Sequence, residues 1–236
     1  VNLTQADFSA SDFTDAQLSE SVIAFTDFSN AKMTGAQLAT CRGEFAGFAE
    51  CDLSAADFSG ANLRGVNFTN AKMNKADLSR ATLKRGVLHG TIFLDAVMRQ
   101  TNLTDSESNE RTKFIRVDMT EADLSGAVWN GVELEDAILN QAQLSRGDFS
   151  GSQLKRVQMI RAIAKGLVLD KCLIEEVDLS GVNMFEGSLS KARIIRSKLQ
   201  LANFFGVDFS DTSFDGTDLE GSIIDRTILH ARQRQA

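Results

Sequence analysis

The amino-acid sequence predicts one all-β solenoid of square cross-section that occupies the whole chain, residues 1–236. Three observations predict this fold. A large apolar residue recurs at every fifth position, a small residue stands two positions before it, and phenylalanines recur every 20 residues. Fixed-period repeats are typical of solenoids, in which each structural unit packs only on its neighbours.

The five-residue period holds over almost the entire chain. A first run of 21 central positions starts at Leu3 and is large and apolar except at Gly43. A second run of 24 starts at Phe114 and has Ala164 as its one small centre. A period of five matches neither a helix, at 3.6 residues, nor a continuous strand, at 2. We therefore expect short extended segments joined by corners.

The positions around each centre are also restricted. The residue two before the centre is small in 44 of 45 repeats, with Leu167 as the exception. Asp or Asn precedes the centre in 18 repeats, and 12 of the 17 glycines lie two after it, as turn residues would. All three cysteines occupy the small position, so we interpret them as small buried residues: Cys41, Cys51 and Cys172.

The spacing of the phenylalanines sets the number of repeats in one coil. Phe8, Phe28, Phe48 and Phe68 are 20 residues apart, which is four repeats and hence a square coil. A triangular coil would instead stack residues 15 apart and break this series. At the usual strand spacing of roughly 4.8 Å, about eleven such coils form a rod about 55 Å long.

The repeat resembles a known family. Ala6-Asp7-Phe8-Ser9-Ala10 and the repeats after it follow an A(D/N)Lxx pattern that is similar to the pentapeptide-repeat family. The resemblance covers the chain except residues 106–111, and it implies a right-handed quadrilateral β-helix. It says almost nothing about function, because every member of the family carries the pattern.

Two segments depart from the pattern. Ser106–Arg111 is polar and interrupts the period, so we expect a short outward loop there. Loops on rigid scaffolds often carry function, which makes Glu107, Asn109 and Arg111 candidate protein contacts; a tolerated insertion is the equal alternative. Residues 227–236 are the candidate for a short C-terminal cap.

Two pairs of phenylalanines stand at outward positions. Phe25 and Phe45 follow their centres by two, and Phe185 and Phe205 follow theirs by one, each pair one coil apart. Stacked aromatic residues on a solvated surface indicate a contact site, so all four are candidate protein contacts. The alternative is local packing, in which Phe45 covers the gap at Gly43.

Charge and composition limit the remaining possibilities. Net charge is −7, distributed in bands along the chain of −7, +5, −6, +4 and −3. Such bands suit a partner with complementary charge, end-to-side self-association, or mere drift among solvated positions. The chain has no apolar run long enough for a membrane span and no visible signal peptide, so a cytoplasmic location is expected. It begins with Val1, which indicates a processed or excised segment.

No residue pattern points to catalysis, a cofactor or a metal. His89 and His230 each follow a centre and are expected in solvent, far apart in sequence. The aspartates are explained as turn residues, because the nonapeptide pattern of calcium-binding β-rolls is missing. A narrow solenoid filled with side chains also offers no concave pocket of the kind that catalysis needs.

These observations favour a non-enzymatic protein-interaction scaffold or binding module, excised from a larger protein or acting alone. Monomer and weak self-association through rod ends or outer phenylalanines both remain open, and direct nucleic-acid binding is not expected. The resemblance also implies two alternatives. One is protection or inhibition of DNA gyrase by DNA mimicry, which the acidity favours and the basic bands oppose. The other is a module of a secreted effector or a type VI secretion accessory protein.

Overall fold

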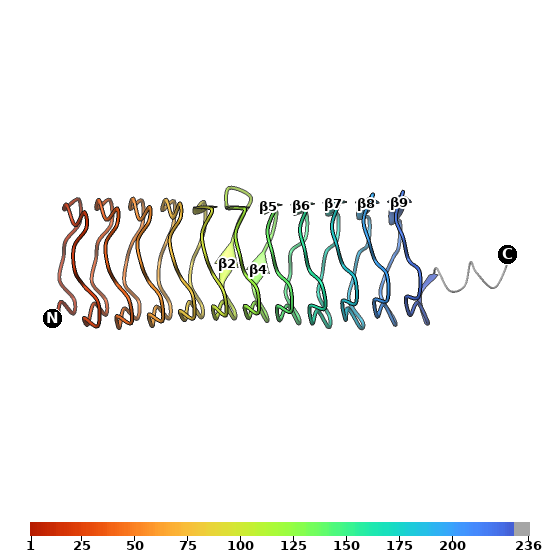
Figure 1. Ribbon diagram of the computed structural model, residues 1–236, viewed down its shortest axis with the longest axis horizontal. Helices are drawn as coiled ribbons and strands as arrows, with labels where there is room; N and C mark the ends of the chain where they lie inside the picture. The colour runs from red at the N-terminus through yellow and green to blue at the C-terminus, as the bar shows by residue number, and fades with distance from the viewer. Residues whose placement is uncertain (229–236) are drawn as a thin grey trace.

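The computed structural model describes residues 1–228, which form a straight rod of stacked coils (Figure 1). Parallel β-bridges join residues 20 apart in successive coils, such as Asn2 with Val22 and Val22 with Arg42. The series that starts at Asn2 reaches Ile223 in eleven such steps. Four pentapeptides therefore make one coil, and the predicted square cross-section is confirmed.

The rod has four faces, each formed by one repeat from every coil. Each face is named here with its outward residues and the corner that follows it. Face A contains the centres from Leu3 to Ile224, face B those from Phe8 to Phe209, face C those from Phe13 to Phe214, and face D those from Leu18 to Leu219.

Regular strands occur on two of these faces, and single bridges join the coils elsewhere. Face C carries a seven-stranded parallel sheet in the order β1-β3-β5-β6-β7-β8-β9, and face B carries the pair β2-β4. The strands are β1 (Ile92–Leu94), β2 (Glu107–Ser108), β3 (Lys113–Ile115), β4 (Val128–Trp129), β5 (Glu133–Glu135), β6 (Gln153–Lys155), β7 (Leu173–Glu175), β8 (Arg193–Ile195) and β9 (Ser213–Asp215).

The interior is a column of stacked side chains. Ring centroids of Phe8 and Phe28 are 5.7 Å apart, those of Phe28 and Phe48 5.2 Å, and those of Phe48 and Phe68 5.4 Å, all with nearly parallel planes. The 20-residue recurrence in the sequence is thus a stack on face B. Each fully buried large side chain stabilises the rod by roughly 1.5–3 kcal/mol.

The corners explain the other restricted positions. The residue two after the centre has a positive φ at 44 corners, of which 12 are glycine and 32 are not. The aspartate before a centre closes the turn, because its Oδ1 accepts a hydrogen bond from the backbone N–H two residues later. Two examples are Asp7 with Ser9, at 2.9 Å, and Asp148 with Ser150, at 3.0 Å.

The outward loop expected at residues 106–111 is much shorter than predicted. Ser106 is fully buried and Ser108 is 6% exposed, so the segment continues the repeat with serine as its centre. Only one residue is inserted, and the bridge spacing rises from 20 to 21, as between Asn102 and Asp123. The extra residue enlarges the corner at Glu110 and Arg111, seen as the wide loop before β3 in Figure 1.

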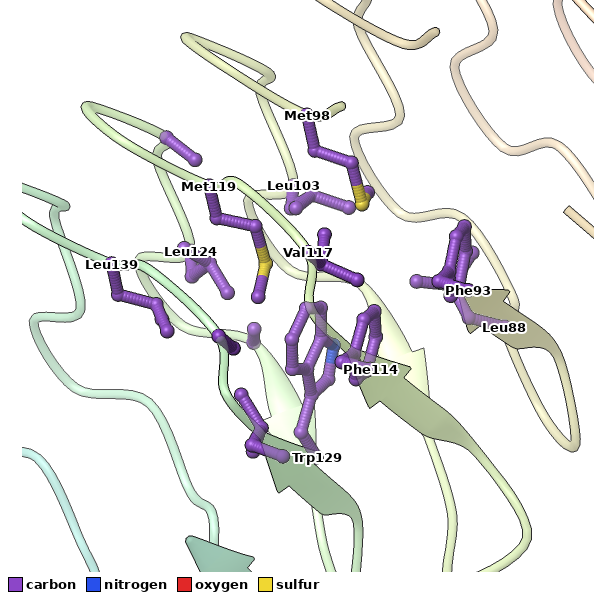
Figure 2. Close-up of a cluster of buried hydrophobic side chains, with 14 of the residues drawn as sticks. Leu88, Phe93, Met98, Leu103, Phe114, Val117, Met119, Leu124, Trp129 and Leu139 are labelled. Carbon is purple, nitrogen blue, oxygen red and sulfur yellow. The ribbon is translucent and has the colours of Figure 1, made fainter. Parts of the chain in front are cut away.

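A serine can stand at a centre here because a larger side chain fills the space beside it. Trp129 is paired with Ser108 in the next coil and is fully buried. Its ring lies 4.4 Å from that of Phe114, with planes 9° apart, as Figure 2 shows. Its Nε1–H donates a hydrogen bond to Ser106 Oγ at 3.1 Å, so the one tryptophan has the polar partner that burial demands.

The two small centres are compensated by their neighbours. A Cβ at Gly43 would lie 2.9 Å from Leu63 Cδ2 and 3.0 Å from Ile23 Cγ1, so these two side chains already fill the gap. Near Ala164, the oversized Leu167 takes up interior volume. Leu167 fits because Gly147 occupies the same position one coil before, where an added Cβ would meet Leu167 Cδ1 at 3.3 Å.

The C-terminal cap expected at 227–236 lies almost wholly outside the described residues. Thr227 is buried and Ile228 is 40% exposed at the end of the described chain. Within residues 1–228, no helix has the length and apolar character needed to cross a membrane.

Candidate functional site

Nothing in the described part of the chain gathers groups that could hold a metal. No three His, Cys, Asp or Glu side chains come together in residues 1–228. The cysteines are buried, and loss of hydration raises the pKa of each thiol to about 12, as for Cys41. Their thiols face backbone instead, for example Cys51 Sγ at 2.8 Å from the carbonyl oxygen of Phe28.

Charge is divided among the four faces as well as among bands along the rod. Face A carries seven basic and five acidic residues, and face C carries nine and ten. Face B carries three basic and nine acidic residues, and face D four and eight. Face A is therefore the only net basic face among the described residues, on a protein whose net charge is −7.

The charges at the corner of face C are satisfied by one another. Asp95 and Arg116 occupy the same corner in successive coils, and Arg116 Nε lies 2.6 Å from Asp95 Oδ1. Arg156 Nε lies 2.6 Å from Asp136 Oδ1, and Arg196 Nη2 lies 2.9 Å from Glu176 Oε1. Alternating sign at 20-residue spacing thus makes a ladder of ion pairs up one edge of the rod.

The ladder changes the acidity of its carboxyl groups. Hydrogen bonds from Arg116 hold the pKa of Asp95 below its ordinary value, and those from Arg156 do the same for Asp136. Because these groups are solvent-exposed, each pair contributes little to stability. The ladder also leaves this corner with few unpaired charges to offer a partner.

A shallow hollow of about 420 Å³ runs along the corner between faces D and A. Its floor consists of small residues, including Ser59, Gly60 and Ser79. Gln100 Nε2–H donates a hydrogen bond to Glu121 Oε2 at 2.7 Å, so these polar groups on its wall bind each other. The sequence analysis missed this hollow, although the run of small residues at 20-residue spacing is readable.

Phe25 and Phe45 form an exposed stack at the corner of face A. Their ring centroids are 5.2 Å apart with planes at 15°, yet the residues are 56% and 50% exposed. Phe45 lies over Gly65 in the next coil, where a Cβ would come within 2.5 Å of its ring. It therefore does not cover Gly43, whose gap is filled from inside.

Phe185 and Phe205 have a different setting. Their rings are also stacked, at 5.4 Å and 4°, but both residues are half-buried on face A. The guanidinium carbon of Arg226 lies 5.4 Å from the Phe205 centroid, which shields part of that ring. Both pairs thus lie on face A, toward opposite ends of the rod, and the first is the more accessible.

The remaining sequence candidates lie in and beside the enlarged corner on face B. Glu107 is exposed on β2, and Arg111 is exposed at the corner itself. Asn109 closes the turn, because its Oδ1 accepts hydrogen bonds from the backbone N–H groups of Gly90, at 3.0 Å, and Arg111, at 3.2 Å. The structure does not bring these residues near either phenylalanine pair, which are on face A.

The comparisons with known proteins agree with this architecture. A family model described as pentapeptide repeats matches the chain in eight copies, over residues 1–38, 46–85, 118–156 and 202–230. The gaps between these matches contain Gly43, the one-residue insertion and the Ala164–Leu167 irregularity. A comparison with curated proteins found no match.

Solved structures show the same fold. HetL, a pentapeptide-repeat protein involved in heterocyst differentiation regulation in the cyanobacterium Nostoc sp. strain PCC 7120, is 22% identical with a TM-score of 0.62. That match covers 89% of this chain and 86% of HetL. A trypsin-treated form of QnrB1, a plasmid-mediated fluoroquinolone resistance protein, is 19% identical with a TM-score of 0.45, covering 78% of this chain and 89% of its own.

Proposed function

The chain belongs to the pentapeptide-repeat family, and we propose that its rod is a non-enzymatic protein-binding module that contacts its partner through Phe25 and Phe45 on face A. One observation carries the proposal: these two large aromatic side chains are half or more exposed while every phenylalanine at an interior coil is buried. Aromatic anchors supply much of the energy of protein interfaces.

The local backbone gives no structural reason for phenylalanine at these positions. Both residues have a φ of 56°, in the left-handed region that a bulky side chain rarely adopts. Glycine fits this conformation without strain and occupies 12 corners of the same rod. A solvent-exposed aromatic at a strained corner is best explained by a gain made on binding.

The stack itself contributes modestly to the free rod. An aromatic pair is worth about 0.5–1.5 kcal/mol beyond its buried area, and here much of each ring remains in water. Burying both rings under a partner would release roughly 1.5–3 kcal/mol for each fully covered side chain. The larger gain therefore lies in association.

Affinity capture from a lysate of the source cells tests the proposal. The wild type is compared with Phe25→Ser/Phe45→Ser and with Phe185→Ser/Phe205→Ser, and bound proteins are quantified by mass spectrometry. We expect the first double variant to keep its melting temperature within a few degrees and lose a specific partner. The second, whose rings are half-buried, should lose stability more than binding.

Equal capture by the wild type and by Phe25→Ser/Phe45→Ser would contradict the proposal. So would a large loss of stability in that variant with capture unchanged, because the stack would then be a structural element. Loss of capture only in Phe185→Ser/Phe205→Ser would move the contact to the other end of face A.

A further inference from the structure

We propose that the partner docks an acidic segment with an apolar anchor on a patch of face A, an inference that rests on the proposed function and specifies its chemistry. The docking patch is defined as Phe25, Phe45, Arg42, Arg64 and Arg85. It combines the most exposed aromatic stack with arginines on the one net basic face of the rod.

The coil geometry brings these residues together. Phe25, Phe45, Gly65 and Arg85 are each one coil apart at the same corner of face A, so they form one column. Arg64 directly precedes Gly65 on the same face, in the coil next to Phe45. At about 4.8 Å per coil, the column from Phe25 to Arg85 measures roughly 14 Å, which about five extended residues would span.

The arginines of the patch lack acidic partners. Within residues 1–228, Arg42, Arg64 and Arg85 are exposed and make no ion pair. This contrasts with the arginines of the face C ladder, which are each paired with a carboxylate in the preceding coil. Three unpaired guanidinium groups beside an aromatic stack present both charge and apolar surface to the same ligand.

Acidic groups near the patch do not cancel it. The Glu44 carboxylate accepts a hydrogen bond from Asn62 Nδ2–H at 3.0 Å, which directs it to its own face. Lys84 Nζ lies 3.8 Å from Asp105 Oδ2, so those two charges form a pair at the far end of the patch. Asp105 and Asp123 then follow on face A and bound the basic region.

The same boundary favours a short peptide segment over a nucleic acid. A polyanion longer than the patch would meet Asp105 and Asp123 along face A, and the net acidic faces B and D on either side. These charges would repel it, and salt would weaken what attraction remained. An acidic segment of about five residues meets only the arginines.

Selection of random dodecapeptides displayed on phage against the full chain tests the inference. We expect enriched peptides to combine Asp or Glu with a large apolar residue. A labelled synthetic copy should bind in fluorescence anisotropy, and a copy with Gln and Asn in place of its acids should bind about tenfold more weakly or worse, a loss of about 1.4 kcal/mol.

Three variants and one second probe complete the test. Arg64→Glu/Arg85→Glu should weaken the acidic peptide at least about tenfold, and Phe25→Ser/Phe45→Ser should do the same. Arg161→Glu, at an exposed corner of face D, is the matched control and should bind as the wild type does. Single-stranded oligothymidylate should bind more weakly than the acidic peptide.

The outcomes separate this inference from the proposed function. Enriched peptides that are neutral or basic, yet lost in Phe25→Ser/Phe45→Ser, would overturn the acidic partner and leave the protein-binding module standing. Unchanged binding in Arg64→Glu/Arg85→Glu, tighter binding of oligothymidylate, or no enriched peptide would each overturn the inference. The affinity capture described above decides the proposed function independently.

Discussion

Replacing Leu124 with aspartate should break the rod at its middle coils. Leu124 is a fully buried centre of face A, near Met119 and Leu103 (Figure 2). Removing a buried leucine side chain costs about 2–5 kcal/mol, and an unpaired carboxylate in the dry interior costs several more unless it is protonated. Because a domain is typically stable by only about 5–15 kcal/mol, we expect the central coils to unfold.

The neighbouring residue provides the control. Asp123 points outward, and its Oδ1 accepts a hydrogen bond from the Ser125 N–H at 2.9 Å. Asp123→Ala should therefore cost only about 0.5–1.5 kcal/mol. Thermal and urea unfolding followed by circular dichroism compare the two variants, with Leu124→Met as a volume-conserving third. Similar melting temperatures for Leu124→Asp and Asp123→Ala would refute the assignment of inward and outward positions.

Three further predictions follow from the same structure. The three thiols should resist a disulfide reagent at pH 8 until the rod is unfolded, and fast reaction of the native protein would contradict their burial: Cys41, Cys51 and Cys172. The pKa values of Asp95 and Asp136 are lowered by folding, so their stabilisation is present above the unfolded pKa of about 3.9 and is lost as pH falls through the folded values. Acid unfolding should therefore shift to higher pH in Arg116→Gln/Arg156→Gln, and an unchanged midpoint would count against the ladder. Purified protein should not protect DNA gyrase supercoiling from ciprofloxacin at micromolar concentration, because basic face A spoils a DNA-like surface; clear protection would revive the DNA-mimic alternative.

The fold was predictable because its rule is one-dimensional. A centre such as Phe8 must pack on Phe28, so the 20-residue recurrence is written directly into the sequence. The segment at 106–111 was mispredicted because Ser108 is a small polar centre, and the volume that it lacks is supplied by Trp129 in the next coil. Local pattern cannot show such compensation between coils, since it depends on contacts 21 residues apart.

The surface was only partly predictable. Sequence position identified Phe25 and Phe45 as outward, but only the structure shows them exposed while Phe185 and Phe205 are half-buried. Charges counted along the chain appeared as bands. The faces and the ladder emerge only when residues are grouped by 20, with one added after the insertion before β3.

Photo-crosslinking tests the central claim, that the rod binds a protein through face A, most directly. A benzoylphenylalanine introduced in place of Phe45 is compared with one in place of Ser54, a half-buried outward residue on the opposite face C. After irradiation of cells that express each variant, the account predicts a discrete covalent adduct from position 45 and none from position 54. Equal adducts at both positions, or none at position 45, would contradict it.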